Sequence, residues 1–271
     1  MACGLAFSAP TLPAAEPVKL FNGTNLDGFT TWLRDTRSDD PRGVFSVADG
    51  AIRISGDGYG YLATKRLFRN YHLKLEFRWG SQAGLDRKER KGKALDSGVF
   101  LHATGPHGNS HDGEGAYMAA IECNVFEGAT GDVLLIRGND AEGKLIAPRV
   151  QVTAGPRRDA DGFPYWQPGG RPLTLRRWGR VNWRGKARDW ADVRGFRGPG
   201  DLEKPAGEWN RLECVCRNGA ITLVLNGTTV NQVTDVSPRE GRILLQCEGA
   251  EIFFRSLSLI QFEEPRQSFS R

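Results

Sequence analysis

The chain has 271 residues, 39% of them hydrophobic and 25% charged, and carries a formal net charge of +5. This length and hydrophobic content allow one large domain with a substantial core. The 34 glycines and 14 prolines favour strands joined by many turns. No stretch approaches the roughly 18 apolar residues of a membrane-spanning helix, which excludes a helical membrane protein.

The first 17 residues differ from the rest of the chain, because they are small and apolar and Glu16 is their only charged residue. They predict a leader or a signal-peptide remnant, since a complete signal has a basic start and a longer apolar centre. Ala2-Cys3-Gly4 is similar to the end of a bacterial lipoprotein cleavage box, in which Cys3 carries the lipid. We expect an exported protein of the periplasm or cell envelope rather than a cytoplasmic one. One domain is expected over residues 18–262, with a tail over 263–271.

Strand signals then recur along the whole domain. Two apolar runs between residues 44 and 54 flank Asp49-Gly50, which accepts the positive φ angles of a tight hairpin turn. Residues 71–79 alternate apolar and polar side chains with the period of a half-buried strand. Further strands are predicted at 98–102, 119–126, 133–136, 212–216, 221–225, 229–233, 243–246 and 251–259, with Asn226-Gly227 as a second hairpin turn. This pattern predicts an all-β jelly-roll sandwich.

Two long segments carry little strand signal, residues 81–96 and 155–207, and loops of such length are typically functional or disordered. The second has twelve basic and six acidic residues, a net charge of 12 − 6 = +6, which exceeds that of the whole chain. It also holds four of the seven tryptophans, including Trp183 and Trp190. Such side chains stack on sugar rings or on single-stranded nucleic acid, or simply cover a sheet. We expect this segment to form one wall of a sugar pocket, and we expect no nucleic-acid partner.

The most informative segment runs from residue 119 to residue 132. It begins with an apolar strand that carries Glu122, and burying an unpaired carboxylate costs several kcal/mol, so the residue should have a partner or a function. Glu122 and Asn124 face one side of a regular strand, and Glu127 joins them only if a bulge intervenes. The spacing E-x-N-x-x-E is similar to the E-x-D-x-x-E strand of laminarinase-type glucanases, with an amide replacing the middle acid. The alternative is a structural salt bridge or turn cap.

Histidines and cysteines are the candidate metal ligands. Three of the four histidines fall within ten positions: His102 at the end of a strand, and His107 and His111 in a Gly-rich loop. With the nearby Asp112 and Glu114, the loop histidines could hold a divalent cation, and His102 could act as a base. Each loop histidine could equally be solvated. Four of the five cysteines lie in apolar runs without the paired spacing of a zinc site, and we expect them to be buried thiols.

Several short blocks resemble, in order, the 3-keto-disaccharide hydrolase domain family. The first is LFNGTNLDGF at residues 20–29, which resembles the family's opening LFNGKDLSGW. The others include VADGAI from residue 47, YHLKLEF from 71, DSGVFL from 96, IECN from 121, GEWN from 207 and LQCEGAEIFFR from 245. This resemblance implies a concanavalin A-like lectin/glucanase fold and action on glycosides oxidised at C3. The chain departs from the family at Asn124, where Gln is usual, and at His102, where Arg is common.

A ketone at C3 acidifies the hydrogen on C2, so a base can remove it, the aglycone can leave from C1, and water can add back. The candidates for the base, the acid and the electrophile at the developing enolate are Glu122, Glu127, His102 and Lys186. The candidate substrate-binding residues are Asn124, Asp132, Trp183, Trp190, Gln246 and Glu248. The alternatives are a non-catalytic carbohydrate-binding module on the same fold and an ordinary retaining glucanase, whose carboxyls would lie about 5 Å apart. A metal requirement and the oligomeric state stay open.

Overall fold

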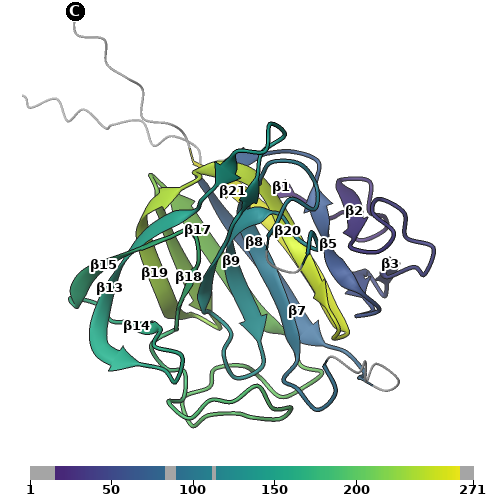
Figure 1. Ribbon diagram of the computed structural model, residues 1–271. Helices are drawn as coiled ribbons and strands as arrows, with labels where there is room; N and C mark the ends of the chain where they lie inside the picture. Colours follow the sequence, from purple (N-terminus) through teal and green to yellow (C-terminus); the bar gives the residue numbers. More distant parts are fainter. Residues whose placement is uncertain (1–15, 83–89, 112–113, 263–271) are drawn as a thin grey trace, which may run out of the picture.

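The protein is a β-sandwich, seen in a computed structural model that describes residues 16–82, 90–111 and 114–262. Two antiparallel sheets pack face to face (Figure 1), which confirms the predicted all-β sandwich. Within the described ranges, no helix is long and apolar enough to cross a membrane. Cys3, Asp112, the tail from residue 263 and residues 83–89 of the first long segment lie outside the described residues.

The first sheet has 11 strands. Its order along the hydrogen-bonded path is β14 (Pro164–Trp166), β13 (Arg149–Arg158), β19 (Thr228–Ser237), β18 (Ala220–Leu225), β17 (Asn210–Arg217), β7 (Tyr71–Trp79), β21 (Ile252–Gln261), β4 (Ala51–Ile54) and β3 (Phe45–Ala48). Off this path, β1 (Val18–Lys19) pairs with β21 and β15 (Arg171–Arg176) pairs with β13.

The second sheet has eight strands and carries the candidate site. Its order is β16 (Gly179–Val181), β10 (Val133–Ile136), β9 (Ala119–Phe126), β8 (Asp96–Thr104), β20 (Glu240–Glu248), β5 (Tyr59–Thr64) and β2 (Phe29–Leu33), with β6 (Phe68–Arg69) paired to β20. A separate small ribbon joins β11 (Gly138–Asn139) to β12 (Leu145–Ile146).

The space between the sheets is the main core. Along β7 the buried residues alternate with half-buried ones from Tyr71 to Trp79, as the period of two predicts. They pack with inward side chains of the second sheet such as Val99, Ile121 and Leu245. Each such Leu, Ile, Val or Phe contributes about 1.5–3 kcal/mol when it is fully buried.

The second sheet is buried on both faces. Every residue of β9 is buried, and so is nearly every residue of β8. The face turned away from the main core packs a second apolar cluster that includes Tyr61, Phe100 and Leu244. This explains why β9 appears in the sequence as a continuous apolar run instead of an alternation. A charged side chain on that outer face therefore lies in largely apolar surroundings.

Residues 155–207, expected as one long loop, instead contain regular structure. They supply the end of β13 and all of β14, β15 and β16. Nearly all of β15 is exposed, so no buried face gives it a hydrophobic pattern. β16 is only three residues long and pairs with β10 at the edge of the second sheet. Its place there brings Arg180 opposite Leu134, next to the strand of Glu122.

Candidate active site

A cavity of about 400 Å³ opens on the outer face of the second sheet, and we call it the acid pocket. Three carboxyls, from Asp96, Glu122 and Glu248, line it together with polar side chains from neighbouring strands and turns. The remaining lining residues are Arg34, Tyr59, Tyr117, Asn124, Leu134, Ile136, Arg180 and Gln246. Pockets of this volume hold a ligand of small-molecule size.

Strand register explains why these polar side chains converge. β8 lies between β9 and β20, and Gly98 pairs with Asn124 of β9. Residues two apart share a face, so Glu122 lies beside Asn124, just as Glu248 lies beside Gln246 on β20. A Cβ atom on Gly98 would collide with Glu122 Oε1 and would lie 2.9 Å from Gln246 Oε1. Because Gly98 has no side chain, the ends of the Glu122 and Gln246 side chains can both occupy the space above it.

The carboxyls of Glu122 and Glu248 have different surroundings. Tyr117 Oη donates a hydrogen bond to Glu248 Oε2 at 2.8 Å, and Gln246 Nε2 donates to the same oxygen at 2.6 Å. Burial raises the pKa of Glu248, but the donor from Tyr117 opposes that shift. Glu122 has no hydrogen-bond donor among the described residues, and burial followed by the charge of Glu248 raises its pKa well above 4.5. The donors thus favour the ionised form of Glu248, whereas burial and the charge of Glu248 favour the protonated form of Glu122.

Arginines at the edge of the pocket balance its negative charge. Arg90 Nη2 lies 3.3 Å from Asp96 Oδ2, and the charge of Arg180 acts on all three carboxyls, opposing the rise in their pKa values. Burial nevertheless raises the pKa of Asp96 well above 3.8. Arg180 Nε also lies 3.9 Å from Asp132 Oδ2, at the border between the acid pocket and the neighbouring Asp132 network.

Two acceptors in the pocket have no partner within the described structure: Asn124 Oδ1 and Gln246 Oε1. Both side chains are 2% exposed. A buried acceptor without a donor costs about 1–3 kcal/mol, so a ligand that supplies donors to both atoms would be stabilised here. Hydroxyl groups of a sugar would supply the missing donors.

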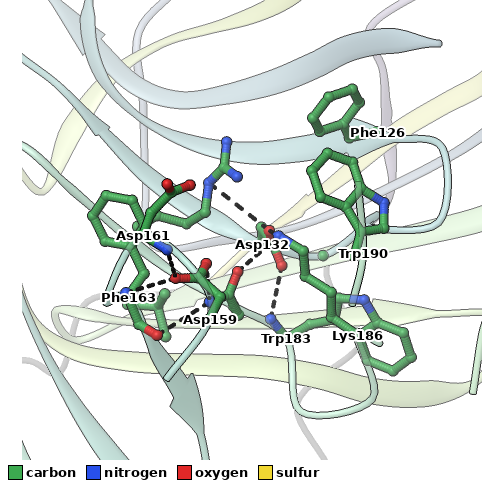
Figure 2. A network of polar contacts seen from close by, with 12 residues as sticks. Phe126, Asp132, Asp159, Asp161, Phe163, Trp183, Lys186 and Trp190 are labelled. Atoms are coloured by element: carbon green, nitrogen blue, oxygen red, sulfur yellow. Dashed lines mark hydrogen bonds and ion pairs between the residues drawn. The ribbon is translucent and has the colours of Figure 1, made fainter. Parts of the chain in front are cut away.

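Asp132, Lys186, Trp183 and Trp190, expected at the substrate, form a separate buried network (Figure 2). Lys186 Nζ donates to Asp132 Oδ2 and to Asn182 Oδ1, both at 2.8 Å, and Trp183 N donates to Asp132 Oδ1 at 2.8 Å. Trp183 is buried in the main core. Trp190 stacks under Lys186 Nζ at 4.5 Å, and its Nε1 donates to Glu127 O. None of these four lines the acid pocket, although Lys186 and Trp190 line a smaller neighbouring cavity that shares Arg180.

Glu127 and His102 also lie away from the acid pocket. No bulge occurs near Glu127, since β8 and β9 stay in register from Asp96 opposite Phe126 to Leu101 opposite Ile121. Its Oε2 instead accepts the N–H of Leu95 at 3.2 Å, the turn-cap alternative. His102 sits in a bulge of β8, packs edge-on against Tyr71 of the first sheet and bonds Pro238 O through Nδ1. Burial lowers its pKa to about 4, so the imidazole is neutral at neutral pH.

The loop histidines are held separately. His107 stacks on Trp32 and Tyr61, with Tyr61 Oη 2.9 Å from its Nδ1. His111 Nε2 lies 2.9 Å from Asn139 Oδ1. Across the residues that the structure describes, no group of three or more His, Cys, Asp or Glu side chains could hold a metal ion. The four described cysteines are buried free thiols, as expected.

Sequence reasoning missed Asp96, Arg180 and Tyr117 as pocket residues. Asp96 had a signal, because it is two residues from Gly98 and so shares its face. Arg180 had none, since a three-residue edge strand has no periodicity to place it. Tyr117 precedes β9 in an irregular segment, and only the fold brings it to Glu248.

Fold and pocket together define a carbohydrate-active β-sandwich protein. More specifically, the model of the 3-keto-alpha-glucoside-1,2-lyase-like domain matches residues 16–260, and the chain belongs to this family. A search of curated protein sequences gave no match.

Several solved structures have a related fold at low sequence identity. One is a protein described as a candidate glycosyl hydrolase from Parabacteroides distasonis ATCC 8503, with 15% identity, a TM-score of 0.49 and coverage of 91% of this chain and 94% of that one. Another is the carbohydrate-binding module CBM66 from Bacillus subtilis, with 10% identity, a TM-score of 0.47 and coverage of 88% and 98%. A β-glucanase from Bacillus licheniformis has 11% identity, a TM-score of 0.45 and coverage of 93% and 100%.

Proposed function

We propose that the protein cleaves 3-keto-glycosides by elimination across C1 and C2, followed by hydration. The observation that carries this proposal is the grouping of Glu248, Arg180 and Glu122 around one pocket of about 400 Å³. Elimination needs a base at C2, a cation at the ketone oxygen and an acid at the leaving oxygen. The three side chains supply one group of each kind, and membership of the family supports a 3-keto-glucoside as substrate.

Glu248 is the base in this mechanism. Both of its hydrogen-bond donors bind Oε2, so Oε1 is the oxygen that takes the proton from C2. The electrons of the C2–H bond move toward the C3 ketone and form an enolate. Arg180, whose charge acts on the carboxyls of the pocket, stabilises the negative charge on the enolate oxygen at C3.

Glu122 is the acid. Its raised pKa favours the protonated form. As the enolate collapses to the C3 ketone and a C1–C2 double bond, the C1–O bond breaks and Glu122 gives its proton to the leaving oxygen. Water then adds across the C1–C2 double bond: Glu122 takes a proton from the water as oxygen bonds to C1, and Glu248 returns its proton to C2. The net reaction is hydrolysis, with Glu122 and Glu248 restored.

Deuterium exchange separates the two roles. Methyl 3-keto-glucosides of both anomers are incubated with protein in D₂O, and the C2 hydrogen and the released methanol are followed by NMR. We expect Glu122→Gln to keep C2 exchange while cleavage falls by about a hundredfold or more, and Glu248→Gln to lose both. Loss of exchange in Glu122→Gln, with exchange kept in Glu248→Gln, would reverse the assignment of base and acid.

Unoxidised glucosides are the matched control substrates. Equal cleavage of plain and 3-keto-glucosides would indicate an ordinary glucanase, whereas binding with neither exchange nor cleavage would indicate a carbohydrate-binding module. Melting temperatures of all variants show whether a loss of activity reflects unfolding. Glu122→Gln should melt no lower than the parent protein, because it removes a carboxyl that the fold leaves without a donor.

A further inference from the structure

A second cavity, of about 550 Å³, lies directly beside the acid pocket, and we call it the apolar pocket. The two cavities share Leu134, Ile136 and Arg180 as lining residues. The part of the apolar pocket away from the acids is lined by Phe163 and Trp178. A ligand seated on Glu122 and Glu248 would therefore extend past the shared residues onto these aromatic rings.

Trp178 and Phe163 form an aromatic pair with ring centroids 5.2 Å apart and an interplanar angle of 64°. Trp178 is 56% exposed, the largest exposed aromatic side chain among the described hydrophobic residues. This exposed indole lines a cavity beside a polar pocket and so offers an aromatic face to a ligand bound there. Since the pair adds little to the core, its place is better explained by what it contacts in the cavity.

The Trp178–Phe163 pair forms an aromatic wall of the cavity, and a chain of hydrogen bonds holds its Phe163 side. Asp159 Oδ1 accepts the N–H of Phe163 at 2.8 Å, and Asp159 Oδ2 accepts a hydrogen from Asn182 Nδ2 at 2.8 Å. Asn182 in turn binds Lys186, which binds Asp132. Figure 2 shows Asp161 and Phe163 on one side of this network, with Phe126 and Trp190 on the other. The half-buried Asp159 thus ties the backbone of Phe163 to the buried Asn182, Lys186 and Asp132, and a pre-organised surface binds a flat ligand at lower entropic cost.

We infer that the apolar pocket is the aglycone subsite and that the protein takes 3-keto-glucosides with an aromatic aglycone. This inference rests on the proposed function, because the acid pocket must hold the oxidised sugar. Aromatic rings bind Trp and Phe by offset or edge contacts. A second sugar ring would need several hydrogen-bond partners. Among the lining residues, only Arg180 and Asp161 have charged side chains that could supply them. The remaining side chains are aliphatic or aromatic and suit a phenolic leaving group.

The test compares phenyl and methyl 3-keto-glucosides, in both anomers, with the parent protein and Trp178→Ala. We expect KM for the phenyl substrate to rise about tenfold in the variant, since a stacked aromatic contact is lost, and KM for the methyl substrate to change less than about twofold. Trp209→Ala is the matched control, because Trp209 packs on Arg78 and Arg255 of the first sheet. It should change neither constant.

A third substrate, a 3-keto-disaccharide, decides between aglycone classes. If Trp178→Ala raises the KM of the disaccharide as much as that of the phenyl compound, the wall binds sugar rings and the inference is overturned. The inference is also overturned if Trp178→Ala changes the KM values of the phenyl and methyl substrates equally or not at all. Calorimetric binding to Glu122→Gln, with and without Trp178→Ala, keeps the subsite testable if nothing is cleaved. Tighter binding of phenyl than methyl compounds that needs Trp178 would then support the subsite while the proposed reaction fails.

Discussion

Two clusters of buried charge lie close together in this protein and differ in how completely they are satisfied. Around Asp132 and Lys186, both carboxylate oxygens and the ammonium group have partners at 2.8 Å. In the acid pocket, Glu122 has no donor among the described residues, and Asn124 Oδ1 and Gln246 Oε1 are without partners. Burial of charge is common to both clusters. The fold satisfies the charges around Asp132 and Lys186, whereas the carboxyl and the acceptors of the acid pocket are left for a ligand to satisfy.

The same contrast separates the two parts of the 119–132 segment. Its strand half, β9, presents Glu122 and Asn124 to the acid pocket. Its turn half carries Glu127 and Asp132, which cap Leu95 and anchor Trp183. Residues ten positions apart in one motif therefore line the acid pocket at one end and hold the fold together at the other.

The largest expected effect is on stability, from breaking the satisfied cluster. Asp132→Asn or Lys186→Met removes one partner of a buried ion pair, which costs about 3–5 kcal/mol. The loss in Lys186→Met should be at the lower end, because Arg180 Nε lies 3.9 Å from Asp132 Oδ2. The double variant should lose less than the sum of the two single variants, because the pair is removed together. Urea unfolding of the four proteins measures this cycle. Additive losses would mean that the two side chains do not stabilise the fold as a pair.

How far the sequence predicts this site follows from strand periodicity. The hairpins at Asp49-Gly50 and Asn226-Gly227, and the strands 71–79, 119–126 and 133–136, follow from local patterns and match the structure. Periodicity also puts Glu122 with Asn124, because one strand fixes both. It could not separate Lys186 from the pocket or bring Arg180 to it, since their positions depend on pairing between distant segments and not on local spacing.

A smaller effect, on activity, is expected from Gly98→Ala. The new Cβ would occupy the space in which Glu122 Oε1 and Gln246 Oε1 meet. Both neighbours are ends of flexible side chains, so the fold can adjust, but the carboxyl of Glu122 must move. Displacing a catalytic group by a fraction of an ångström should lower kcat by about tenfold or more, while urea unfolding changes little. Gly143→Ala is the contrasting control: its added Cβ meets no atom, but its positive φ strains alanine, so it should lower stability and leave kcat unchanged. An unaltered kcat in Gly98→Ala would show that Glu122 does not act from this position.

The smallest effect is a difference in the pH dependence of melting. Glu122 has a folded-state pKa raised above 4.5, so the stability linked to its proton is fully present below about pH 4.5 and is lost as pH rises through the folded pKa. Glu203, whose pKa burial raises to about 7, gives a similar decline in every variant that keeps it. Between pH 5 and pH 8 the melting temperature should therefore fall in the parent protein and fall less in Glu122→Gln. One kcal/mol shifts the melting temperature of a chain of this size by about 2–4 °C, so a difference of a few degrees is measurable by calorimetry.

Lys186→Met should instead melt lower at every pH and should not flatten the curve, because it leaves Glu122 in place. Parallel curves for the parent protein and Glu122→Gln would mean that the fold does not raise the pKa of Glu122. Asp96, which also lines the pocket and has a raised pKa, would then be the candidate proton donor.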